Sequence, residues 1–358
     1  MKTDEIPAIS KFRFSSSIAD DVWHPNDDPR AYEWWYFDAL SDDGRDAVVI
    51  IFLDNFVFSP RYNRRDSSEV RSRIPAVAFF YYRDGQVLCR AINEFQPDDF
   101  EASTVKPECR IGDNSIEFKS APYGSGFMIS ISSMTHRGFA IDASFEWLTV
   151  EGDFSPRDPV DGAHHWNLVV PRADVSGRVV VNGTSDEPVR TLHFRGTGYH
   201  DHNYDTRWLP QTVHDWHWGR AHFNDATAVF YRYTECGSSE ESCVTKLLTI
   251  RDGLLSESDA GFAESDTKRD IFGIRFPQRM TFHAANGTKL KVSHLETIDS
   301  SFFYLRFLSE MTLTQPDCAP HTAVGITEFL SPKTLKYRWL DWLVDMRIGR
   351  RGKGARIP

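Results

Sequence analysis

Apolar and polar residues alternate along much of this 358-residue chain. Four runs show it most clearly, each with its apolar side chains at every second position: Phe127, Ile129, Ile131; Ile141, Ala143, Phe145, Trp147; Val229, Tyr231, Tyr233; and Phe303, Leu305, Phe307. Because successive side chains of a strand point to opposite faces, this period predicts antiparallel strands with one buried face. Turn-forming dipeptides lie between strand-like runs, at Asp43-Gly44, Asp84-Gly85, Asn182-Gly183, Asp252-Gly253 and Asn286-Gly287. The pattern predicts an all-β fold, either a barrel or a sandwich.

Signals for helices are sparse. The best one begins at Ser331-Pro332, where a candidate N-cap precedes proline at the first helical position. Apolar residues then recur at helical spacing and predict a helix over about 332–343: Leu335, Trp339, Trp342 or Leu343, and Met346. Three polar segments are expected to be irregular: an arm at 1–30, a mobile loop or lid at 59–75, and a long hairpin excursion at 234–270. The polar stretch 182–190 separates two strand-rich halves and is the expected domain boundary.

Composition narrows the possible partners. The chain has 41 basic and 51 acidic side chains, a net charge of −10, which disfavours binding to nucleic-acid backbones. Its longest apolar run, 47–53, is seven residues, whereas a membrane-spanning helix needs about 20. The N-terminal residues lack the apolar segment of a secretory signal. Five scattered cysteines without a CxxC motif favour a cytoplasmic protein, with a Cys236–Cys243 bridge as the alternative.

The chemistry concentrates between residues 164 and 222, which hold eight of the thirteen histidines and four of the ten tryptophans. If 198–203 is extended, Tyr199, Asp201 and Asn203 project to one side, and His200 and His202 to the other. By the same rule His164 and Trp166 share a face, with His165 opposite. Trp216 and Trp218 also share a face, with Asp215 and His217 opposite.

Two interpretations of this segment compete. The first is a metal site with imidazoles from His200, His202, His214 and His217 and an oxygen from Asp201 or Asp215. However, Asp201 would face away from His200 and His202, and the spacing matches no familiar zinc motif.

The second interpretation is an apolar pocket in which Asp201 lies among the rings of Tyr199, His164, Trp166 and one of the two tryptophans of 216–218. Loss of hydration would raise the pKa of this carboxyl group, so that it could donate a proton near neutrality. The aromatic faces could then stabilise the carbocation that alkene protonation creates. The simpler alternative is an aspartate that joins strands by accepting hydrogen bonds.

The residues in question resemble a known family. Three segments carry the likeness: His164-His165-Trp166 through Pro171-Arg172-Ala173-Asp174-Val175; Gly196-Thr197-Gly198-Tyr199-His200-Asp201-His202-Asn203; and Trp216-His217-Trp218-Gly219-Arg220. They are similar to the carotenoid 1,2-hydratase family, also called hydroxyneurosporene synthase, whose fold is lipocalin-like. Three further segments extend the resemblance to about 30–350: Glu33-Trp34-Trp35-Tyr36-Phe37, Phe58-Ser59-Pro60-Arg61-Tyr62 and Phe302-Phe303-Tyr304.

The resemblance implies two antiparallel β-domains and a short C-terminal helix. After the arm at 1–30, residues 31–185 would form a β-sandwich or lipocalin-like domain and 186–358 a lipocalin-like barrel. It also implies a reaction without a cofactor or a metal, in which a terminal isoprenoid double bond is protonated and water adds to the tertiary cation. Carried over by position, Asp201 is the proton donor and His164, Trp166 and Tyr199 are its partners.

The expected partner is a hydrophobic isoprenoid or polyene, and five residues are candidates for binding it: Trp216, Trp218, Asn203, Trp35 and Tyr36. Packing at a domain seam is the alternative for the 33–36 segment. A cyclase of the pericyclic kind, holding a polyene folded, and a lipocalin-like carrier remain alternatives. The basic C-terminus is the candidate for peripheral membrane contact: Arg347, Arg350, Arg351, Lys353 and Arg356.

Overall fold

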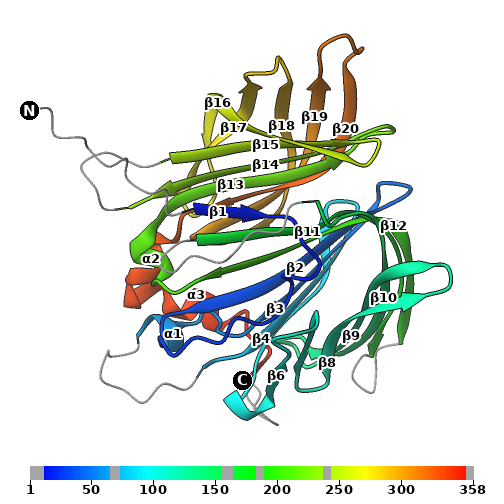
Figure 1. Cartoon of the computed structure of the whole chain (residues 1–358). Coiled ribbons are helices and arrows are strands. Elements are labelled where there is room, and N and C mark those ends of the chain that lie inside the picture. Colours follow the sequence, from blue (N-terminus) through cyan, green and yellow to red (C-terminus); the bar gives the residue numbers. More distant parts are fainter. Residues whose placement is uncertain (1–11, 65–72, 155–163, 183–188, 237–242, 352–358) are drawn as a thin grey trace, which may run out of the picture.

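The structure, a computed structural model, describes residues 12–64, 73–154, 164–182, 189–236 and 243–351. Most of these residues lie in β-strands, which form one large sheet and one closed barrel (Figure 1). The prediction of an all-β fold is confirmed.

The first part of the chain forms the sheet. Its strands are β1 (Phe12–Ser15), β2 (Tyr32–Ser41), β3 (Asp46–Leu53), β4 (Ala76–Arg83), β5 (Gln86–Glu94), β6 (Phe100–Ala102), β7 (Glu108–Ile111), β8 (Asn114–Ala121), β9 (Gly124–Met134), β10 (Ala140–Glu151), β11 (His164–Asn182), β12 (Arg190–Asp205) and the C-terminal β21 (Arg350–Arg351). The order is β21-β5-β4-β3-β2-β12-β11-β10-β9-β8-β7-β6, with β1 parallel to β11. The sheet folds over on itself. This is shown by Phe37 of β2 and Phe127 of β9, whose ring centres lie 5.5 Å apart although other strands separate β2 from β9 in the sheet. The folding brings its alternating apolar residues into a core of their own.

The second part of the chain forms the barrel. Its strands are β13 (Val213–His222), β14 (Thr227–Glu235), β15 (Cys243–Arg251), β16 (Leu254–Arg269), β17 (Arg275–Ala284), β18 (Lys289–Ser300), β19 (Tyr304–Thr314) and β20 (His321–Leu330). The barrel closes because β13 pairs with both β14 and β20. Asp252 and Gly253 turn between β15 and β16 with φ of 52° and 72°, the geometry of a type I′ hairpin turn. The segment 234–270 thus supplies the barrel hairpin β15–β16 rather than an excursion from the fold.

The barrel packs against one face of the sheet (Figure 1). A core rich in aromatic side chains fills the seam between them. Strands β2, β11 and β12 contribute from the sheet, and β13 and β14 from the barrel. Strand β2 is buried along most of its length, because its two faces belong to two different cores.

Helical elements are short. They are α1 (Pro60–Asn63), α2 (Leu209–Thr212), α3 (Asp341–Asp345) and the 3₁₀ segments Pro97–Asp99, Pro332–Lys336 and Arg338–Leu340. The continuous helix expected over 332–343 is wrong: two 3₁₀ turns precede α3, and Trp339, Trp342 and Met346 are exposed. Leu335, Leu340 and Val344 are the buried residues instead. No helix of the described ranges is long and apolar enough to cross a bilayer.

The change from sheet to barrel falls after β12. The boundary expected at 182–190 lies between β11 and β12, two neighbouring strands of one sheet, so β12 groups with the first unit. The expected arm contains β1, which pairs with β11. Of the expected loop at 59–75, residues 60–63 form α1 and 65–72 lie outside the described residues. All five cysteines are free thiols, so the alternative Cys236–Cys243 bridge is not formed.

Candidate active site

Strand β12 divides two chemical environments. Tyr199, Asp201 and Asn203 face the seam, as the alternation predicts. His200 and His202 face the sheet's own core, where His200 stacks on Phe37 with ring centres 3.8 Å apart. The two glycines that precede this segment are close-packed: a Cβ atom on Gly198 would lie 2.5 Å from Nε1 of Trp147. This close approach explains why a glycine stands just before the candidate site.

Asp201 is the acid of the seam, and only 4% of it is exposed. Its Oδ2 accepts hydrogen bonds from the Nε1 group of Trp166 at 3.0 Å and the hydroxyl of Tyr199 at 2.8 Å. Its Oδ1 accepts from the Nδ2 group of Asn203 at 2.9 Å. The Nε1 group of Trp218 donates to the Tyr199 hydroxyl at 3.2 Å. The structure therefore brings together Asp201, Tyr199, Trp166, Asn203 and Trp218.

The surroundings of Asp201 favour its neutral form. Burial raises the pKa of this carboxyl group to about 7, and Glu328 and Asp38 act in the same direction. The hydrogen bonds from Tyr199 and Trp166 lower the pKa, but by less than burial raises it. A carboxyl group with such a pKa exists partly as the acid near neutrality and can serve as a proton donor.

His164 adds a neutral imidazole. Burial and the nearby charge of Arg207 hold its pKa well below the ordinary value. Its Nε2 lies 2.8 Å from the hydroxyl of Tyr231, and its ring stacks on that of Tyr233 at 4.9 Å. Its Nδ1 has no hydrogen-bond partner among the described residues. Such a neutral ring can hold a water molecule through a hydrogen bond, whereas its lowered pKa makes it a weak base.

Two tyrosines of the barrel complete this aromatic wall. Tyr231 stacks on Trp166 with ring centres 4.7 Å apart, and Tyr233 stacks on His164. The sequence predicted that both lie on one face of a strand, but nothing local indicated that this face meets Trp166. Phe12 of β1 packs on the same rings, 5.4 Å from Tyr231.

A cavity of about 120 Å³ lies between the sheet and the barrel, and Tyr36 separates it from the acid: Asp201, Tyr199, Trp166 and Trp218 do not line it. Its wall is largely apolar and includes Trp34, Tyr36 and Trp216. Tyr36 lies between the two, because it lines the cavity and its ring lies 5.3 Å from Trp218 and 6.5 Å from Tyr199.

The cavity also has a polar side that the sequence did not reveal. Arg306, almost fully buried, donates through Nε to Glu328 at 2.8 Å, and Glu328 accepts from the Tyr36 hydroxyl at 2.8 Å. These groups come from β19, β20 and β2, and no sequence motif connects them.

Trp35 is not at the site. Neighbouring residues of a strand face opposite sides, so with Tyr36 in the seam Trp35 lies in the sheet's own core. There it stacks on His202 with ring centres 4.6 Å apart. Of the predicted binding residues, Trp216, Trp218, Asn203 and Tyr36 lie at the seam, and Trp35 does not.

The four histidines of the metal interpretation do not come together. His200 and His202 lie behind β12, that is, on the face of this strand turned away from the seam. His217 stacks on Phe329 of the barrel with ring centres 4.6 Å apart. His214 instead pairs with Asp215, at 2.6 Å.

The histidines behind β12 belong to a network of ion pairs. Asp21 contacts Nε2 of His200 at 3.0 Å and Nδ1 of His202 at 2.9 Å. Glu33 contacts Nε2 of His202 at 2.7 Å and Nδ1 of His24 at 2.8 Å. The ligand atoms of His24, Glu33 and His202 lie within 4.8 Å of one another, close enough to share a cation. Their spacing is that of direct ion pairs, so we interpret them as a charge network.

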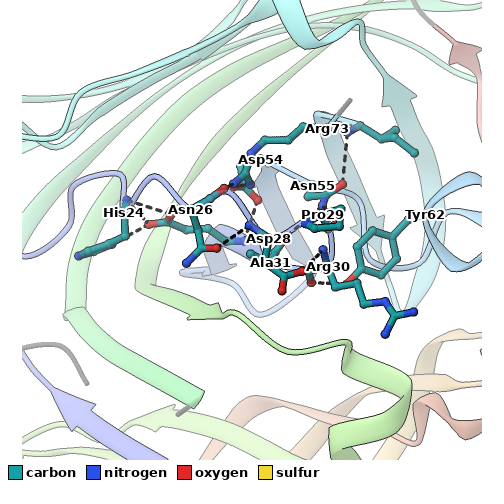
Figure 2. A network of polar contacts seen from close by, with 12 residues as sticks. His24, Asn26, Asp28, Pro29, Arg30, Ala31, Asp54, Asn55, Tyr62 and Arg73 are labelled. Atoms are coloured by element: carbon teal, nitrogen blue, oxygen red, sulfur yellow. Dashed lines mark hydrogen bonds and ion pairs between the residues drawn. The ribbon is translucent and has the colours of Figure 1, made fainter. Parts of the chain in front are cut away.

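The described part of the expected arm, residues 12–30, is fixed to the protein by the pairing of β1 and by polar contacts, some of which Figure 2 shows; residues 1–11 lie outside the described residues. The Asn55 side chain donates to the carbonyl oxygen of Ala31 at 2.9 Å, and the Tyr62 hydroxyl donates to that of Arg30 at 2.6 Å. Arg73 pairs with Asp54 in the same region. The polar composition of this segment suggested an arm. Composition does not show which charged side chains have buried partners, so it could not reveal that the segment is held in place.

These features define a lipocalin-like all-β protein with a buried acid at the seam between a sheet and a barrel. The profile of the family described as carotenoid hydratase CrtC matches residues 153–356. A protein from Chlorobaculum tepidum named hydroxyneurosporene dehydrogenase is 31% identical over 349 residues, which cover 93% of this chain and 91% of that protein. The chain belongs to the carotenoid hydratase family, and the resemblance of the sequence motifs is confirmed.

Two further proteins are similar. The acyclic carotenoid 1,2-hydratase of Thiocapsa roseopersicina is 25% identical over 320 residues, which cover 85% of this chain and 71% of that protein. The crystal structure of an AttH protein from Nitrosomonas europaea aligns with a TM-score of 0.57 at 14% identity, covering 87% of this chain and 95% of that one. The latter shows that the two proteins share a fold.

Proposed function

We propose that this protein hydrates a carbon–carbon double bond of an isoprenoid or polyene, with Asp201 as the general acid. The observation that carries the proposal is a buried carboxyl group with a pKa of about 7 among aromatic rings. Membership of the carotenoid hydratase family supports an apolar, unsaturated substrate.

In the proposed reaction, Asp201 transfers its proton to the less substituted carbon of the alkene. The positive charge that develops on the neighbouring carbon lies against the rings of Trp166, Tyr199 and Trp218. Water positioned by His164 adds to this cation, and the proton that the water loses returns to the carboxylate of Asp201, which resets the site. The sum is alkene plus water giving an alcohol, which needs no electron acceptor. General acid catalysis of this kind typically contributes about 10²–10⁴-fold to the rate.

The substrate needs a path from the cavity to the acid. Tyr36 lies between them, in edge-to-face contact with Trp218. A cavity of about 120 Å³ is smaller than the ~300 Å³ or more of typical ligand pockets. We therefore propose that Tyr36 and Trp218 separate when the substrate enters.

The test is Asp201→Asn, which keeps the shape of the side chain and removes the acid. Purified protein is incubated with an acyclic carotenoid dispersed in detergent, and the products are analysed by mass spectrometry. We expect the unaltered protein to add the mass of one water and the variant to lose this activity while it still binds the substrate. Undiminished hydration by the variant would refute the mechanism.

A cyclase and a carrier remain the alternatives, and the largely apolar cavity wall suits both of them. The same experiment separates the three functions. A cyclase gives a product of unchanged mass and depends on Trp166 or Trp218 more than on the Asp201 carboxyl group. A carrier returns the substrate unaltered.

A further inference from the structure

The C-terminal helical segment carries an unusual group of exposed apolar side chains. Four of them lie within ten residues: Tyr337, Trp339, Trp342 and Met346, exposed to 54%, 72%, 59% and 55%. Elsewhere in the described ranges, exposed large apolar residues are scattered singly or in pairs. Exposed apolar residues that gather in this way mark interaction surfaces more often than scattered ones do.

The segment is attached to the rest of the protein by buried side chains and an ion pair, which fix the positions of its exposed rings. Leu335, Leu340 and Val344 are buried in the seam core. Arg64 pairs with Asp341 and donates through Nη2 to the carbonyl oxygen of Leu335 at 3.1 Å. The side of the segment that faces the protein is thus packed and paired, and the side with the exposed aromatic rings faces outwards.

The charge of the segment is opposite to that of the whole protein. Residues 333–346 contain three basic side chains, Lys333, Lys336 and Arg338, and two acidic ones, Asp341 and Asp345, giving +1 in a chain of −10, and Asp341 is paired with Arg64. Lys333, Lys336 and Arg338 are exposed beside the aromatic residues. Tryptophan and tyrosine favour the headgroup region of a bilayer, and clustered lysine and arginine favour anionic lipids.

The same segment borders the cavity. Leu343, Val344 and Arg347 line the cavity wall, within a few residues of Trp342 and Met346. A partner that contacts the exposed side of this segment would therefore lie next to the cavity.

We propose that the exposed side of residues 333–346 docks on an anionic lipid bilayer, with Trp339 and Trp342 in the headgroup region. The purpose of docking, collection of an apolar substrate from the membrane, rests on the proposed function, whereas the docking itself does not. This assigns membrane contact mainly to the aromatic segment rather than to the basic C-terminal end. Lys353 and Arg356 of that end lie outside the described residues.

The test is sedimentation of the full chain with two kinds of vesicle, one of phosphatidylcholine alone and one that also contains phosphatidylglycerol. We expect binding to the anionic vesicles that weakens as salt is added, and at least tenfold weaker binding of a Trp339→Ala, Trp342→Ala variant. A Lys333→Gln, Lys336→Gln, Arg338→Gln variant should lose the preference for anionic lipid. The matched control is Leu254→Ala, Ile271→Ala, which removes two similarly exposed apolar side chains outside the segment and should bind normally.

Three results would overturn the proposal: no binding of the unaltered protein to anionic vesicles, equal binding by the double tryptophan variant, or a dimer that becomes monomeric in that variant. The last would assign the patch to contact between two copies. Activity on detergent-dispersed substrate separates this proposal from the proposed function, because the tryptophan variant should retain it. Asp201→Asn should still bind vesicles.

Discussion

Replacing Asp201 by asparagine should change the stability of the protein in a pH-dependent way. The asparagine Oδ1 can accept the hydrogen bonds that Trp166 and Tyr199 now donate to Oδ2. Its amide NH₂ would meet the NH₂ of Asn203, but Asn203 can turn its amide, since its own Oδ1 has no partner among the described residues. The variant can thus keep the hydrogen bonds of the site while losing the titrating group.

The magnitude follows from the pKa of Asp201. That pKa is about 7 in the folded protein and 3.8 ordinarily. A raised pKa means that the folded state binds the proton more tightly, so its stabilising effect is complete below pH 3.8 and is lost as the pH rises through 7. At about 1.4 kcal/mol per pKa unit, the folded protein at pH 8 loses roughly 4 kcal/mol relative to low pH, and at pH 5 roughly 2 kcal/mol. Asparagine has no such dependence.

The assay is unfolding by urea at pH 5 and pH 8, followed by tryptophan fluorescence. The free energy of unfolding of Asp201→Asn minus that of the unaltered protein should increase by about 2 kcal/mol from pH 5 to pH 8. A constant contribution from changed hydrogen bonds cancels in this comparison. Asp174→Asn, at an exposed position of the same sheet, should show no comparable increase. A difference independent of pH would refute the assignment of a raised pKa to Asp201.

Two further predictions concern the groups around β12. Tyr199→Phe removes a hydrogen bond that lowers the pKa of Asp201, so the pH at which hydration declines, near 7 in the unaltered protein, should move upwards in kcat/KM profiles. An unmoved profile would count against Asp201 as the acid. Burial alone would lower the pKa of His202, but the carboxylates of Glu33 and Asp21 raise it to about 9, so its stabilising effect is complete below pH 6.5 and is lost as the pH rises through 9. His202→Gln should therefore lower the free energy of unfolding by roughly 3 kcal/mol more at pH 6 than at pH 10; equal losses in urea unfolding at both values would contradict this.

The two faces of β12 could be predicted from the sequence because they follow from local geometry. A period of two separates Asp201 from His200 and His202 wherever the strand lies. The same reasoning could not place Trp35 and Tyr36, since both faces of β2 are buried and an apolar strand does not show which face meets the barrel. Since neighbouring residues of a strand face opposite sides, Trp35 and Tyr36 could not both line one pocket. The prediction that both bind the substrate overlooked this.

The rest of the site depends on contacts between distant parts of the chain. Tyr231 and Tyr233 meet His164 and Trp166 only because β14 packs on β11 across the seam. The expected helix over 332–343 failed for a related reason: that segment has apolar residues on two sides, one for the seam and one exposed. Periodicity detects an apolar side but does not identify its partner.

A comparison of Asp21 with Asp201 explains how one strand can support opposite chemistry on its two faces. Burial would raise the pKa of both carboxyl groups. On the opposite face of β12, the contacts of Asp21 with the imidazoles of His200 and His202 outweigh burial, and the pKa of Asp21 falls below its ordinary value. On the seam side, the hydrogen-bond donors to Asp201 among the described residues are all neutral, Trp166, Tyr199 and Asn203, and its pKa stays raised. Hydrogen bonds from neutral groups stabilise a carboxylate less than charged partners do. A positively charged side chain paired with Asp201 would therefore lower its pKa and remove the acid, whereas the neutral imidazole of His164 on the same side leaves the acid in place.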